Sequence, residues 1–147
     1  MPYPPKNILA PTDFSDGAEP AVAYAFELAK AVGAKVHVLH AYSIPALPED
    51  GGMTHERIAG LKALGEKKLR ELVDKYQATG AVGQLSLKMG DPRDLIPPAI
   101  TELGVDLVVM GTHGRRGISR VVLGSVAGHM VRTAICPVLV VPMSDKR

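Results

Sequence analysis

The sequence predicts an α/β protein, an open Rossmann-like sheet of five parallel strands with helices on both faces. Two observations lead to this fold class. Short β-branched runs alternate along the chain with amphipathic segments of helical period, which is typical of parallel strands joined by crossover helices. The run Val105 to Met110 is also apolar on both faces, as expected of a strand that helices cover from both sides.

The first strand is predicted over Lys6 to Pro11, and the second over Lys35 to Tyr42. Between them, Asp16-x-x-Glu19 resembles a capping box and predicts a helix start, with Pro20 close enough to distort the first turns. Gly33 is the expected end of that helix. Its apolar stripe consists of Ala21, Ala25, Leu28 and Val32.

The middle of the chain predicts a loop, a long helix and a third strand. Prolines and glycines between Ser43 and Met53 indicate the loop, and Thr54 is the expected cap of the helix. Gly80 is expected to end the helix, and Val82 to Met89 alternates as a strand does. The helix has one apolar stripe: Ile58, Leu61, Gly65, Leu69, Leu72 and Tyr76.

The last third predicts two more strand-and-helix pairs. Asp91-Pro92 supplies an N-cap followed by proline at the first helical position, and this helix is expected to reach about Leu103 with an interruption at Pro97-Pro98. The fourth strand is the run Val105 to Met110, and the fifth is Pro137 to Val141. A final helix between them carries Val126, Met130, Val131 and Ala134.

Length and composition narrow the class of protein. The 147 residues, 46% of them hydrophobic, predict one domain spanning residues 1–147. A net charge of +2 does not indicate a nucleic-acid surface, and no apolar run predicts a membrane span or a signal peptide. The single cysteine, Cys136, excludes an intrachain disulfide. We therefore expect a cytoplasmic protein without nucleic-acid or membrane partners.

A glycine-rich stretch follows the fourth strand and runs into the last helix. It reads Gly111-Thr-His-Gly114, then nine residues, then Gly124-Ser125. Glycine lets backbone N–H groups approach an oxyanion, and a helix N-terminus adds unpaired donors and a favourable dipole. The stretch therefore predicts a phosphate site.

Strand ends place further residues near that site, because ligands of open parallel sheets bind beyond the carboxyl ends of the strands. Asp13 follows the first strand and is expected to accept hydrogen bonds from ribose or adenine. The chain lacks both G-x-x-x-x-G-K-[ST] and a G-x-G-x-x-G after the first strand, which excludes a P-loop and a dinucleotide-binding fingerprint. The predicted nucleotide-binding residues are Pro11, Thr12, Asp13, Ala41, Met110, Gly111, His113, Gly114, Arg115, Gly124, Ser125 and Val126. Arg115 is equally typical of a solvated loop arginine, and for His113 an exposed loop position is the favoured interpretation.

Five blocks of sequence, in this order, resemble the universal stress protein family over nearly the whole chain. They are Ile8-Leu-Ala-Pro-Thr-Asp13-Phe-Ser15, Val36-His-Val-Leu-His40, Gly90-Asp-Pro92, Asp106-Leu-Val-Val-Met-Gly111 and Cys136-Pro-Val-Leu-Val-Val141. The glycine stretch also equals the family's ATP-binding signature, G-x2-G-x9-G-[ST]. The resemblance implies strand order 3-2-1-4-5, ATP in the cleft, often with a divalent cation such as Mg or Mn, and a homodimer paired through Val138 to Val141.

We expect an ATP-binding stress protein that acts as a nucleotide-dependent sensor or regulator. One alternative is slow ATP hydrolysis or self-phosphorylation, with Ser125 or a nearby serine as the acceptor. A second alternative is an interaction module whose dimer surface functions without nucleotide.

Overall fold

The computed structural model describes residues 3–43, 55–112 and 123–143. The predicted loop from Ser43 to Met53 and the predicted cap Thr54 lie outside these ranges, apart from Ser43 itself. The elements are β1 (Asn7–Pro11), α1 (Glu19–Val32), β2 (Lys35–Tyr42), α2 (His55–Asp74), a 3₁₀ turn (Gln77–Thr79), β3 (Val82–Met89), α3 (Pro92–Glu102), β4 (Leu107–Gly111), α4 (Ser125–Thr133) and β5 (Val138–Val141).

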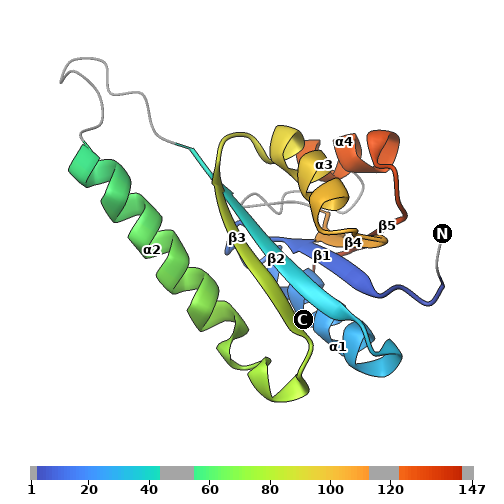
Figure 1. The fold of residues 1–147 in the computed structure, drawn as a ribbon. Helices are drawn as coiled ribbons and strands as arrows, with labels where there is room; N and C mark the ends of the chain where they lie inside the picture. Colours follow the sequence, from blue (N-terminus) through green and yellow to red (C-terminus); the bar gives the residue numbers. More distant parts are fainter. Residues whose placement is uncertain (1–2, 44–54, 113–122, 144–147) are drawn as a thin grey trace.

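The sheet is five-stranded and parallel, with order β3-β2-β1-β4-β5, which confirms the predicted fold class and order. Figure 1 shows β1 between β2 and β4. The chain moves outward from β1 to β2 and β3, then crosses back to β4 and β5. The order therefore reverses between β1 and β4, the point where such sheets bind ligands.

Two apolar clusters cover the two faces of the sheet. On one face, Ile8 and Val36 pack with residues of α1 and α2. On the other, Leu9 and Leu39 pack with residues of α3 and α4. Figure 1 shows the same division, with α3 and α4 together across the sheet from α1. Alternate strand residues thus enter opposite clusters, as the period of a strand requires.

The start of α1 differs from the predicted capping box. The helix begins at Glu19, with Ala18 in the N-cap position, and Pro20 lies in the first turn, where its missing N–H breaks no helical bond. No side chain caps the helix at Ala18. Instead, Ser15 Oγ and the Ser15 carbonyl both accept from the N–H of Ala18, at 3.2 and 3.1 Å. The end is as predicted, because Gly33 adopts a left-handed φ of 75°.

The long helix ends earlier than its apolar stripe suggests. α2 stops at Asp74, and a 3₁₀ turn leads to Gly80 with φ 71°. The stripe itself is confirmed, because Gly65 and Leu69 are buried on the side of α2 that faces the sheet. No helix within the described ranges is long and apolar enough to cross a membrane.

The start of α3 is confirmed, since Asp91 caps it by accepting from the N–H of Arg93 at 2.8 Å. The predicted interruption at Pro97-Pro98 is wrong. The helix continues through both prolines to Glu102, and both are exposed. The carbonyls deprived of a helical partner belong to the exposed residues Arg93 and Asp94, where water is within reach.

Candidate functional site

A cavity of about 220 Å³ opens at the carboxyl ends of β1, β2 and β4. It lies at the reversal of strand order, between the two halves of the sheet. Most of its lining is apolar, with a few polar groups, which is usual for small-molecule sites. The lining residues are Pro11, Thr12, Asp13, Ala18, Leu39, Ala41, Pro92, Ile96, Met110, Gly111, Thr112, Ser125, Val126 and Ala127.

The β1 side of the cavity is a turn held by its own side chains. The N–H of buried Thr12 donates to the carbonyl of Leu39 at 2.9 Å, which fixes the turn to β2. Thr12 Oγ1 accepts from the N–H of Phe14 at 3.0 Å, and Asp13 Oδ1 accepts from the N–H of Ser15 at 2.9 Å. The Asp13 carboxylate therefore has a fixed place at the cavity wall.

The opposite side is formed by β4 and the start of α4. Met110 is 5% exposed and Gly111 ends the strand. Gly124 is the N-cap of α4, and its N–H donates to the carbonyl of Thr112 at 2.6 Å. The next N–H groups begin the helix and have no partner within it, so they form a site suited to an anion.

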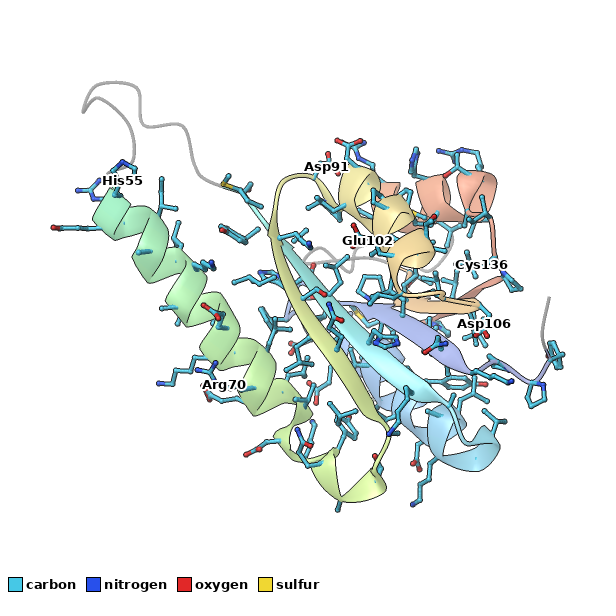
Figure 2. All side chains as sticks on the ribbon, viewed as in Figure 1. His55, Arg70, Asp91, Glu102, Asp106 and Cys136 are labelled. Carbon is cyan, nitrogen blue, oxygen red and sulfur yellow. The ribbon has the colours of Figure 1, made fainter. Side chains whose placement is uncertain are left out.

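The third wall comes from α3, which the sequence analysis did not include in the site. Pro92 starts this helix and Ile96 follows one turn later, fully buried. Figure 2 shows Asp91 at the start of α3. Hydrogen bonds from Arg93 hold the pKa of Asp91 at about 2, so the carboxylate stays ionised and keeps the helix start fixed.

The predicted site residues that the structure describes lie together. Each of them lines the cavity except Gly124, which caps the helix beside it. His113, Gly114 and Arg115 lie outside the described residues. The residues that were missed are Ala18, Leu39, Pro92, Ile96, Thr112 and Ala127. The block Gly90-Asp-Pro92 was the available signal for the α3 wall.

Two titratable side chains outside the cavity, His37 and Cys136, have pKa values shifted by burial in the fold. His37 and His40 lie on opposite faces of β2, because they are three residues apart on the strand. The Nδ1 of His37 accepts from the N–H of Gln84 at 2.9 Å and its Nε2 donates to Asn7 Oδ1 at 3.0 Å, and burial lowers its pKa. Burial, and secondarily the charge of Asp106, raises the pKa of the Cys136 thiol. Figure 2 shows Cys136 and Asp106 near each other, at the amino ends of β5 and β4.

Fold and cavity together define an open doubly wound α/β protein with a cavity at the point where the strand order reverses. The universal stress protein family model matches residues 4–142, so the chain belongs to that family.

Similar sequences and solved structures support this membership. The universal stress protein MJ0531 of Methanocaldococcus jannaschii is 33% identical over 145 residues, which cover 96% of this chain and 84% of the relative. A universal stress family protein of Burkholderia pseudomallei has a crystal structure that is 27% identical, with a TM-score of 0.75 over 93% of this chain and 96% of its own. A universal stress protein in complex with cAMP is 29% identical, with a TM-score of 0.68 over 95% and 98%.

Proposed function

We propose that the cavity binds an adenine nucleotide, ATP in particular, and that the protein acts as a nucleotide-dependent regulator in the stress response. One observation carries the proposal: three features line one cavity. They are the Asp13 carboxylate, the apolar wall that includes Ala41 and Met110, and the amino end of α4. A nucleotide has a polar ribose, a flat apolar base and an anionic tail, and these three groups match the three features. The solved relative in complex with cAMP supports the same ligand class.

Each end of the nucleotide is assigned to one side of the cavity. Asp13, with Pro11 and Thr12 beside it, accepts from ribose or adenine, while Ala41 offers backbone groups to the base edge and Met110 packs on the base. The phosphates lie against Gly111, Gly124 and the start of α4, where Ser125 and Val126 present N–H groups and Gly124 has no side chain in the way. From the glycine signature alone we also assign His113, Gly114 and Arg115, which lie outside the described residues, to phosphate binding, and we propose that Mg or Mn accompanies the triphosphate.

The cavity favours binding and signalling over rapid hydrolysis. Among the described lining residues, Asp13 is the one ionisable side chain, and its Oδ1 already accepts the turn's hydrogen bond. We place this regulator in the cytoplasm, where adenine nucleotides are available to it.

Calorimetric titration of nucleotide-stripped protein with Mg-ATP, ADP and cAMP tests the proposal. Gly124→Val adds a branched side chain where phosphate approaches, and the φ of −62° there suits any residue. We expect the variant to fold and to bind ATP at least about tenfold more weakly. Gly60→Val is the matched control, since a Cβ at Gly60 on α2 has nothing within 4 Å. Equal ATP affinity of wild type and Gly124→Val, or no binding of any nucleotide, contradicts the proposal.

We further propose that two copies pair through β5, which is an edge of the sheet. Its four residues are all partly exposed, and an apolar edge favours strand pairing. Val140→Lys changes a residue outside both apolar clusters, and should convert a dimer to a monomer in sedimentation velocity. Leu64→Lys, on exposed α2, is the control that should remain dimeric. A monomeric wild type would exclude the pairing.

A further inference from the structure

The turn after β1 contains the one described non-glycine residue with a left-handed backbone, Phe14 at φ 64°. Aromatic residues rarely adopt this conformation, and such strain persists only where surrounding contacts hold it. Here Thr12 and Asp13, both in the cavity wall, accept from the N–H groups of Phe14 and Ser15. The strained residue is therefore bonded to the residues that would meet a ligand.

The Phe14 ring lies between β2 and α2. It packs on His40 with ring centroids 4.4 Å apart, and Lys68 of α2 places its Nζ 5.7 Å from the ring centroid. His40 is 8% exposed, and its Nδ1 donates to the carbonyl of Thr12 at 2.8 Å. One continuous set of contacts therefore joins the cavity wall to α2 through the ring.

There is space for the ring to move. A second cavity of about 300 Å³ lies between the turn and α2, with Phe14 in one wall and Lys68 and Leu72 in the other. Thr12 lines this cavity and the nucleotide cavity alike, so the turn is the partition between them.

We infer that the turn from Thr12 to Ser15 transmits occupancy of the nucleotide cavity to α2 through the Phe14 ring. A ligand hydroxyl that bonds to Asp13 shares the carboxylate that holds the turn. It therefore favours one of two arrangements of Phe14. In one, the backbone is left-handed and the ring packs on His40; in the other, the backbone strain is released and the ring lies in the second cavity. A ligand shifts such an equilibrium by its differential affinity for the two states. The inference rests on the proposed nucleotide function and adds α2 as the surface that responds.

Hydrogen exchange with and without Mg-ATP, after calorimetry has measured ATP binding, tests the inference. We expect ATP to change amide exchange in residues 65–74 of α2 by at least about threefold in the wild type. Phe14→Gly removes the ring, and glycine adopts the observed φ without strain. This variant should bind ATP yet lose the α2 response. A wild type that binds ATP without an α2 response, or a response that survives in Phe14→Gly, overturns the inference alone, whereas absence of ATP binding overturns the proposed function as well.

A second variant tests the coupling from the α2 side, because coupling between two sites is reciprocal. Lys68→Ala removes the ammonium over the ring without touching the nucleotide cavity. We expect ATP affinity to change by about two- to fivefold, the size of an exposed cation–π contact. Lys67→Ala, the adjacent exposed lysine, is the matched control and should leave affinity unchanged. Equal affinities of the two variants would count against the coupling.

Discussion

Gly83→Ala should destabilise the protein although the backbone of Gly83 is not in the left-handed region. A Cβ built there would lie 2.7 Å from His37 Nδ1, 2.8 Å from His37 Cε1 and 3.0 Å from the carbonyl oxygen of Val36. The imidazole cannot move aside freely, because it accepts from the N–H of Gln84 and donates to Asn7 Oδ1. The added methyl group must therefore break these bonds or separate β2 from β3.

Two lost hydrogen bonds cost about 1 kcal/mol each, and overpacking adds about 1 to 3 kcal/mol. Alanine lowers the chain entropy of the unfolded state, which offsets up to about 1 kcal/mol of this loss of stability. We therefore expect a net loss of about 2 to 5 kcal/mol in the free energy of unfolding, measured by urea denaturation at neutral pH. Gly60→Ala is the control, and should be neutral or stabilising because nothing lies within 4 Å of its Cβ.

A double-mutant cycle separates the steric cause from other effects of alanine. In a His37→Ala background the obstructing ring is absent, so Gly83→Ala should cost less than about 1 kcal/mol. A cost of Gly83→Ala that is the same with and without the imidazole would refute the reasoning, as would a single variant within about 0.5 kcal/mol of wild type.

Three further outcomes are expected. Burial lowers the pKa of His37 from its ordinary value of 6.5, so the neutral imidazole contributes its full stability above pH 6.5. This contribution is lost as pH falls from 6.5 toward the lower pKa of the folded state. Between about pH 7.5 and about pH 5.5, the free energy of unfolding should therefore fall more steeply in the wild type than in His37→Ala. Asp91→Ala should lower the free energy of unfolding in urea by about 1 kcal/mol, because the α3 cap is lost. Asp94→Ala, at a nearby exposed residue that does not cap the helix, should lower it clearly less, and equal losses would exclude capping as the cause. Cys136, 8% exposed and with a raised pKa, should react with a disulfide reagent at least about tenfold more slowly in the folded protein than in urea, and equal rates would contradict its burial.

Strands were more predictable than helix ends, for a physical reason. The bounds of β2 and β3 agree with the sequence because apolar periodicity and flanking glycines both mark them. β4 begins later than predicted, at Leu107. Asp106 just before it stays joined to the start of β1, because its N–H donates to the carbonyl of Asn7 and its carboxylate accepts from the N–H groups of Lys6 and Asn7. The start of α1 was predicted at Asp16-x-x-Glu19, but the helix begins at Glu19 after Ala18, whose N–H bonds back to Ser15.

The site was predictable where its residues follow strand ends and unpredictable where helices approach from another part of the chain. Asp13 and Gly111 follow β1 and β4, so topology alone brings them together. Ile96 reaches the same cavity because α3 crosses the sheet between β3 and β4, and its apolar character is equally consistent with an ordinary core position. Sequence period specifies the buried face of such a helix without specifying which of its residues meets a cavity.

Opposite ends of the sheet carry different kinds of constraint. At the amino ends of the strands, Asp106 accepts from backbone N–H groups at the start of β1, and His37 joins β1, β2 and β3 through Asn7 and Gln84. At the carboxyl ends, the cavity is bounded by a turn with a strained residue beside an open space. Rigid bonding at one end fixes the register of the strands, so the other end can rearrange without loss of the fold. Variants at His37 should therefore change stability while nucleotide affinity stays the same, and variants at Phe14 should change the response to nucleotide with the smaller effect on stability.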